Sequence, residues 1–210
     1  MHEITLDRDT HIYKVNGRVV PANTRILQDQ GISDMSGIPA ERLAYKSALG
    51  TAVHYCIHLH EVGDLDETTI DDRILPYFLA YKKFTEVNRF EPRHTELMLY
   101  SKKWDFCTTL DLQGPLTYGG KEESEDIIEI KCVWQMMPSN SVQTAAQQIA
   151  FEENYPDIKI KRRWGLQLKP SGNYELEPYT DLTDKQTFLA ALTVYKWRVQ
   201  HGLISKKDNQ

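Results

Sequence analysis

Hydrophobic and polar positions change their spacing several times along the chain, and each change marks a predicted element. Near the N-terminus, apolar and polar residues alternate on both sides of Asn16-Gly17. This dipeptide readily supplies the two positive φ angles of a type I′ turn. Residues 11–15 and 18–20 are therefore predicted to form a β-hairpin.

Three segments after the hairpin have helical spacing, with apolar residues recurring every three or four positions. They cover residues 24–31, 38–62 and 66–90. Pro39 stands at the opening of the second segment, where the first turn of a helix tolerates proline, and Gly63 ends it. Pro76 marks a start or a kink within the third segment.

The spacing then becomes that of strands. Short apolar segments bounded by turn residues cover 96–100, 104–112 and 126–133, with a polar loop at 119–125. A helix is predicted over 141–155, two strands over 162–168 and 174–177, and a last helix from Thr183, which has capping-box spacing with Gln186. The order predicts an α/β protein with a mixed central sheet and helices on both faces.

Length and composition fit one folding unit. The chain has 210 residues, of which 40% are hydrophobic and 26% are charged, an ordinary globular balance. We expect a single domain over 1–210, with the hairpin and short helix of 1–35 as an appendage.

Composition also bears on the compartment. The sequence has no signal-peptide pattern and no apolar run of membrane-spanning length, so we expect a soluble protein with no membrane partner. Cys56, Cys107 and Cys132 form no CxxC pair, which favours a reducing cytoplasm and argues against a zinc ribbon or an iron–sulfur cluster.

The formal net charge of −5 does not indicate a nucleic-acid partner. Any contact with DNA must therefore use local basic patches. The candidates are Lys102, Lys103, Arg162 and Arg163, the last two within the basic run 159–163. The alternative is that both runs are ordinary solvated edges.

The strongest chemical signal is a carboxylate on one predicted strand followed by a carboxylate and an amine on the next. Glu129 and Lys131 are two residues apart on a strand, so their side chains share a face. If the strand of Asp111 pairs beside them, the carboxylates can bind Mg²⁺ or Mn²⁺. The alternative is a surface ion pair between Lys131 and Glu129.

Phosphodiester hydrolysis needs such a group of residues. A divalent ion polarises the phosphoryl oxygen, acidifies bound water and offsets charge on the leaving oxygen. Lys131 would orient the attacking water and stabilise the negative transition state.

Two helical motifs complete a family resemblance. Gly50 and His54 form a GxxxH motif, and Gln147 stands in a predicted helix after the ExK strand. With these motifs the chain resembles the RecB-like and phage-type exonuclease branch of the PD-(D/E)XK nuclease superfamily. The resemblance implies a restriction-endonuclease-like core and places the family's functional residues on Gly50, His54, Glu96, Asp111, Glu129, Lys131 and Gln147. Phe151, where the family usually has tyrosine, and Cys107-Thr108-Thr109, where it has a glycine-containing run, depart from the pattern.

The resemblance implies a Mg²⁺- or Mn²⁺-dependent deoxyribonuclease without an iron–sulfur cluster. Its substrate would be DNA, as linear duplex or single strand, and its setting phage-type recombination or repair with a recombination partner protein, in the host cytoplasm if a phage encodes it. An exonuclease is the favoured activity. A structure-selective endonuclease with the same triad and a non-catalytic nucleic-acid-binding module on the same fold are the alternatives.

Four further side chains have open roles at this stage. His54 is the expected imidazole ligand, whereas His58 is expected to be a packing or surface residue. Gln147 is expected to hydrogen-bond Lys131 or the water, or else to be a plain helix-face amide. Trp134 either stacks on a base or fills the core.

Overall fold

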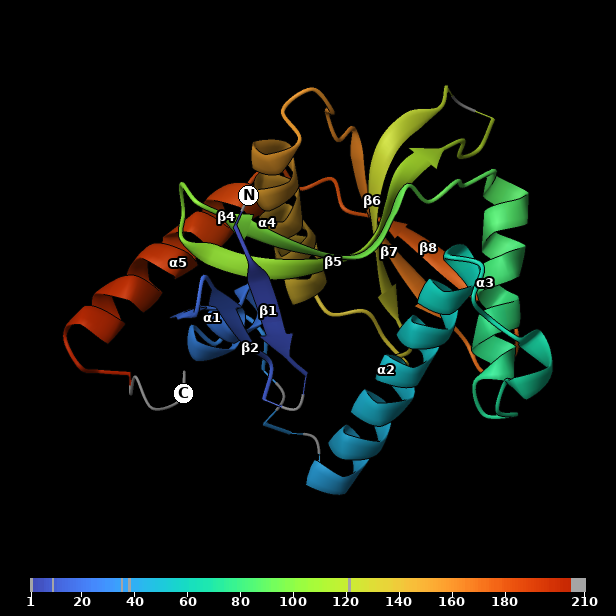
Figure 1. The fold of residues 1–210 in the computed structure, drawn as a ribbon, viewed down its shortest axis with the longest axis horizontal. Helices are drawn as coiled ribbons and strands as arrows, with labels where there is room; N and C mark the ends of the chain where they lie inside the picture. The colour runs from blue at the N-terminus through green and yellow to red at the C-terminus, as the bar shows by residue number, and fades with distance from the viewer. Residues whose placement is uncertain (1, 9, 35, 38, 121, 205–210) are drawn as a thin grey trace.

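The structure is a computed structural model that describes residues 2–8, 10–34, 36–37, 39–120 and 122–204. A five-stranded mixed sheet flanked by helices follows a three-stranded antiparallel sheet (Figure 1). The helices are α1 (Asn23–Asp29), α2 (Ala40–Glu61), α3 (Leu75–Asn88), α4 (Ser139–Asn154) and α5 (Asp184–Gln200). The strands are β1 (Ile4–Asp7), β2 (Ile12–Val15), β3 (Arg18–Val20), β4 (His94–Ser101), β5 (Phe106–Leu116), β6 (Ser124–Lys131), β7 (Arg162–Leu168) and β8 (Tyr174–Pro178).

The large sheet has the strand order β4-β5-β6-β7-β8. Its neighbours pair antiparallel except β6 and β7, which run parallel. A parallel pair needs a long crossover connection, and the segment containing α4 supplies it. The expected mixed central sheet is therefore confirmed, and the strands of Asp111 and Glu129 are neighbours, as the proposed site requires.

Helices cover both faces of this sheet, as predicted. Helices α2 and α3 lie on one face, and α4 and α5 lie on the other (Figure 1). Residues of β6 divide between the two apolar layers: Ile128 and Ile130 pack with α2 and α3, and Ile127 packs with α4 and α5. Because side chains alternate along a strand, Glu129 faces α4.

The N-terminal hairpin is confirmed, and it carries one more strand than predicted. Asn16 and Gly17 have φ angles of 48° and 78°, as the type I′ turn requires. Strand β1 pairs with β2 on the far side from β3, which makes a three-stranded sheet. The extra strand has four residues, and Ile4-Thr5-Leu6-Asp7 does alternate apolar and polar positions, a short signal that the prediction of a two-stranded hairpin left out. Tyr13 of this sheet packs against Tyr100 and Cys107 of the large one.

The predicted helix over 66–90 is wrong in its first part. Only a 3-10 turn at Glu67–Thr69 forms there, and α3 begins at Leu75 with Pro76 in its first turn. Two aspartates compete with helix formation, because their side chains accept hydrogen bonds from nearby backbone N–H groups. The bonds run from Thr68 N–H to Asp66 Oδ1 and from Arg73 N–H to Asp71 Oδ1, at 3.0 and 2.8 Å.

The predicted capping box at Thr183 is also wrong. The Thr183 hydroxyl donates to Asp181 Oδ1 at 2.7 Å, and it does not cap the first turn of α5. Asp181 Oδ1 also accepts a hydrogen bond of 2.8 Å from the Thr183 backbone N–H, the donor that the Gln186 side chain would have bound in a capping box.

None of the described helices is long and apolar enough to cross a membrane. Cys56, Cys107 and Cys132 are buried free thiols.

Candidate metal centre and its surroundings

The candidate site lies where the ladder between β5 and β6 ends. The last paired residues are Leu112 and Ile128. The next residue of β5, Asp111, uses its side chain in place of the ladder: its Oδ2 accepts a hydrogen bond of 2.7 Å from the backbone N–H of Ile130. A buried amide is thereby satisfied, and the carboxylate is fixed beside β6.

Glu96 reaches the same point from β4 through a break in the alternation of side chains. Its φ angle is 48°, in the left-handed region that is costly for a residue other than glycine. Thr95 and Glu96 are adjacent, yet both contact α2, Thr95 through His58 and Glu96 through His54. In a regular strand these two side chains would face opposite ways. The left-handed residue therefore turns a second side chain toward the helix.

Strand β5 breaks its alternation at the same level. Leu110 packs in the layer of α4 and α5, and Leu112 packs in the layer of α2 and α3, although the two are separated by one residue. Their partners Leu97 and Thr95 flank Glu96 on β4. The paired kinks bring Asp111 and Glu96 together in front of α2.

His54 joins the two carboxylates from α2, as the GxxxH motif predicts. Its Nε2 lies 3.2 Å from the carbonyl oxygen of Ile130. A carbonyl only accepts, so Nε2 carries a proton, and Nδ1 faces Glu96 Oε1 at 3.2 Å and Asp111 Oδ1 at 3.5 Å. His54 Nδ1 and the two carboxylate oxygens are then three acceptors close together, which is unfavourable unless a proton or a cation lies between them. This arrangement, with the far ring nitrogen held by a backbone carbonyl, is typical of metal-ligating histidines.

The donor set fits a divalent cation. One ligand atom from each of His54, Glu96 and Asp111 lies within 4.8 Å of the others. Burial, and then the charge of Glu129, raises the pKa of Asp111. Burial lowers the pKa of His54, but the charge of Asp111 and the contact with Glu96 outweigh it and raise that pKa. Burial is the main cause for Asp111, but negative charge contributes to both shifts, and a cation would balance that charge. Glu96, expected only as a supporting residue, belongs to this group.

Glu129, expected as a metal ligand, lies outside that group of three and is held by hydrogen bonds. Its Oε1 accepts from Lys131 Nζ at 2.6 Å and from Gln143 Nε2 at 2.5 Å, and its Oε2 accepts from Gln147 Nε2 at 2.6 Å. Glu129 is only 2% exposed, so these contacts compensate a buried charge. The ion pair with Lys131 is therefore a buried one, and the alternative of a surface pair is wrong.

Two glutamines of α4 hold this pair, and their roles differ from the expected one. Gln147 does not bond Lys131; it donates to Glu129 and to the carbonyl oxygen of Thr109 at 3.1 Å, which bridges β5 and β6. Gln143 accepts from Lys131 Nζ at 3.3 Å. Gln143 was not among the predicted site residues, although it precedes Gln147 by one helical turn and so shares its face.

Lys131 stays protonated in this environment. Burial lowers its pKa, but the charges of Glu129 and Asp111 raise it further, and the result lies above the usual value for lysine. Its ammonium is therefore a permanent positive charge next to the candidate ligands.

Two tyrosines near the site were not expected. The Tyr13 hydroxyl lies 2.6 Å from Thr109 Oγ1, which ties the N-terminal sheet to β5 two residues before Asp111. Tyr179 crosses over Gly165, the β7 partner of Glu129. A Cβ at Gly165 would lie 2.1 Å from Tyr179 Oη. The spacing of residues in the sequence could not predict the position of Tyr179, because its contact with Gly165 crosses from one strand to another segment.

A cavity of about 240 Å³ opens over the site. Its lining includes His54, Glu96, Asp111 and Gln143, together with Arg8 and His11 from the N-terminal segment. Gly50 also borders the cavity, and a Cβ added there would meet nothing within 4 Å, so packing does not require this glycine.

The remaining motif residues are placed as follows. His58 lines the same cavity, but its Nδ1 lies 2.5 Å from Thr95 Oγ1, and His58 is not one of the three residues whose ligand atoms lie within 4.8 Å of one another. Phe151 is fully buried, stacked on Tyr155 with ring centroids 4.7 Å apart, so apolar packing accounts for the absence of tyrosine. Trp134 is 94% exposed, so the expectation that it fills the core is wrong.

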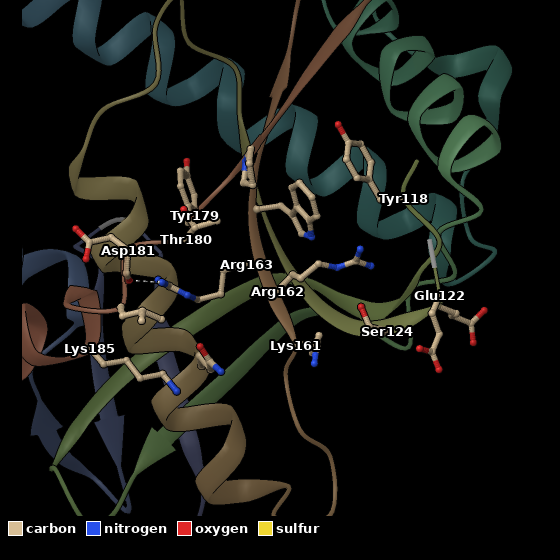
Figure 2. A pocket seen from close by; sticks show the side chains of 15 residues that line it. Tyr118, Glu122, Ser124, Lys161, Arg162, Arg163, Tyr179, Thr180, Asp181 and Lys185 are labelled. Carbon is tan, nitrogen blue, oxygen red and sulfur yellow. Dashed lines mark hydrogen bonds between the residues drawn. The ribbon is translucent and has the colours of Figure 1, made fainter. Parts of the chain in front are cut away.

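The expected basic contacts lie outside this cavity. Lys102 and Lys103 are exposed in the turn between β4 and β5. Arg162 and Arg163 line a separate cavity of about 1020 Å³ at the other end of β6 and β7, together with Lys161, Lys185 and Tyr118 (Figure 2).

Arg162 and Arg163 both bind buried carboxylates. Arg162 Nε donates to Asp126 Oδ2, and Arg163 Nη2 donates to Asp184 Oδ2, each at 2.8 Å. Breaking a buried pair costs about 3–5 kcal/mol. Arg163, which is itself buried, therefore has a structural role, and we no longer expect it to contact DNA.

Comparison with models of protein families finds no match to this chain, and comparison with curated proteins finds no match either. The resemblance to PD-(D/E)XK nucleases therefore rests on the sequence motifs.

Proposed function

We propose that this protein is a metal-dependent deoxyribonuclease with a PD-(D/E)XK, restriction-endonuclease-like core. The observation that carries the proposal is the convergence of four elements on one point. Helix α2 supplies His54, β4 supplies Glu96, β5 supplies Asp111, and β6 supplies Glu129 with Lys131. An ordinary ion pair does not explain two acids, Glu96 and Asp111, beside one imidazole, whereas a cation site does.

His54, Glu96 and Asp111 would hold Mg²⁺ or Mn²⁺. Carboxylate oxygens suit both ions, and an imidazole nitrogen suits Mn²⁺ in particular. When bound, the ion supplies Lewis acidity and a more acidic water for attack on phosphorus.

The chain's own residues act on the phosphate and on the water. Lys131 presents a fixed positive charge. Glu129 accepts hydrogen bonds from Gln143 and Gln147 and keeps the Lys131 ammonium in place. A preorganised charge stabilises the transition state without reorganisation at the moment of reaction. Gln143 lines the cavity and contacts both members of the pair, so it can orient the water.

We propose that the protein is an exonuclease that degrades DNA from its ends, in DNA recombination or repair. A structure-selective endonuclease would use the same residues. A non-catalytic binding module would not need a cation site, and the convergence of His54, Glu96 and Asp111 favours an enzyme over that alternative.

The test is incubation of the protein and Mn²⁺ with linear and with covalently closed circular DNA, with a chelator control. An exonuclease degrades linear DNA alone, and an endonuclease also nicks the circle. If both substrates stay intact with Mn²⁺ and with Mg²⁺, the proposal is wrong.

A further inference from the structure

A groove lies beside the C-terminal end of β6, just beyond Lys131. It has a volume of about 320 Å³. Its lining includes Trp134 and Tyr77 and two lysines, Lys46 and Lys169. Among its lining residues within the described chain there is no aspartate or glutamate. In a protein with a net charge of −5, a groove with this lining is a local basic site.

Trp134 is held in an exposed position by its backbone. The buried Gln167 donates from Nε2 to the carbonyl oxygens of Val133 and Trp134, both at 2.7 Å. One amide group thus fixes two successive peptides of the loop. Trp134 is nevertheless 94% exposed, so these two hydrogen bonds hold the backbone while the ring stays in solvent.

The two lysines line the same groove as the indole, and both are available to a phosphate. Lys46 comes from the N-terminal part of α2, where residues 40–48 are all exposed and the helix projects beyond the sheet (Figure 1). Lys169 follows β7 and pairs with Glu175, which is 66% exposed on its side chain. Such surface pairs contribute little, so a phosphate can replace the glutamate.

We propose that this groove binds an unpaired stretch of a DNA strand. A base stacks on Trp134, and Lys46 and Lys169 contact neighbouring phosphates of the strand. Aromatic stacking combined with cationic contacts to the backbone is the chemistry by which proteins bind single strands without sequence preference. The inference rests on the proposed function, because Trp134 is three residues from Lys131 and would hold the strand next to the site of cleavage.

The experiment measures binding of a short fluorescent oligothymidylate by anisotropy, at low salt and in EDTA, so that cleavage does not intervene. Trp134→Ala should raise the Kd by on the order of 10-fold, and Trp134→Phe should restore most of the affinity, because phenylalanine keeps a face for stacking. Lys46→Ala should also raise the Kd and should reduce the salt dependence by about one phosphate contact.

Trp197→Ala is the matched control. Trp197 is another exposed tryptophan, 53% accessible, but it lies on α5 and stacks on His201. Its replacement should leave the Kd unchanged. Thermal unfolding of each variant should match the wild type, because none of these exposed side chains belongs to the buried core.

The binding proposal and the nuclease proposal can be overturned independently of each other. If wild-type protein binds no oligothymidylate, or if Trp134→Ala binds as tightly as wild type and Trp197→Ala, the groove proposal is overturned, whatever the cleavage assay gives. If Trp134→Ala loses affinity but no metal supports cleavage by the wild type, the binding groove stands and the nuclease proposal fails.

Discussion

The Nδ1 atom of His54 lies 3.2 Å from Oε1 of Glu96, a residue whose backbone φ angle is 48°. A glutamate in that conformation is strained, and strained residues persist where the surrounding structure requires them. Here the left-handed turn brings a carboxylate to an imidazole that already faces Asp111. His54 of α2 and Glu96 of β4 therefore meet at the proposed cation site.

Replacing Glu96 separates its conformational cost from its role as a ligand. Glu96→Gly removes the carboxylate and the steric cost, whereas Glu96→Gln removes the charge and keeps the strain. We expect both variants to bind Mn²⁺ more weakly in calorimetry. The metal-free glycine variant should be more stable than the glutamine variant by about 1 kcal/mol in chemical unfolding. Equal Mn²⁺ affinity in all three proteins would remove Glu96 from the site.

His54 and His58 give a matched pair on one helix. They are one turn apart, but only His54 faces the carboxylates, and His58 contacts Thr95. His54→Ala should raise the Mn²⁺ concentration needed for half-maximal cleavage, and His58→Ala should not. The reverse result at every metal concentration would show that the GxxxH motif is assigned to the wrong histidine.

Lys131→Ala should lower the hydrolysis rate by about 100-fold or more, because it removes the fixed charge beside the ligands. Calorimetry should show Mn²⁺ binding close to that of the wild type, since Lys131 is not among the three ligand residues. Single-turnover cleavage measures the rate without interference from product release. A turnover near the wild-type value would exclude Lys131 from the mechanism.

The metal-free protein should lose stability as the pH rises. The pKa of Asp111 is raised to about 8 by burial and by Glu129, so the folded state binds a proton that the unfolded state releases near pH 3.8. The pKa of His54 is raised from 6.5 to about 9, and its favourable charge is lost over that interval. Both effects have the same sign. The free energy of unfolding in EDTA should therefore fall between about pH 4 and about pH 9.

Denaturant titrations at a series of pH values measure this, with Asp111→Asn as the control. The asparagine cannot ionise, so its variant should lose less stability over the same interval. Saturating Mn²⁺ should reverse most of the loss at high pH, because the ion binds only the folded site. A stability that rises with pH in EDTA would contradict the electrostatic description of this site.

Gly165, the β7 partner of Glu129, allows a test of the packing there, with Gly50 of α2 as the comparison. Gly165→Ala places a Cβ 2.1 Å from Tyr179 Oη and 2.3 Å from Met136 Cε, so we expect a loss of about 1–3 kcal/mol. Gly50→Ala lies in α2 with nothing within 4 Å, and it should stabilise the protein by up to about 1 kcal/mol. Thermal or chemical unfolding checks both. Equal stability of the two variants would show that Tyr179 yields its position easily.

Spacing in the sequence was enough to predict most elements and the proximity of Asp111, Glu129 and Lys131. Alternation and turn chemistry are local properties, and neighbouring strands in the chain usually pair. The same rules could not predict the left-handed Glu96, because alternation assumes a regular strand. They could not predict Tyr179 over Gly165 either, since that contact joins β7 to a segment beyond β8.

Trp134 and Arg163 show a second limit. Both are residue types that occur in nucleic-acid interfaces, and both stand near charged or apolar runs in the sequence. The structure shows that their roles differ. The buried Arg163 binds the carboxylate of Asp184, whereas Gln167 binds the backbone of the loop that carries the exposed Trp134. The partners are distant in the sequence, so composition alone does not distinguish a structural arginine from a binding one.

The release of nucleotides from linear duplex DNA in Mn²⁺, measured side by side for wild type and Asp111→Asn, tests the central claim most directly. The substitution replaces one oxygen ligand by an amide of nearly the same shape, and the amide oxygen can still accept the hydrogen bond from Ile130. We expect Mn²⁺-dependent release by the wild type and a loss of about 100-fold or more in the variant, with the fold retained. Equal rates of release by the two proteins, or no release by the wild type, would contradict it.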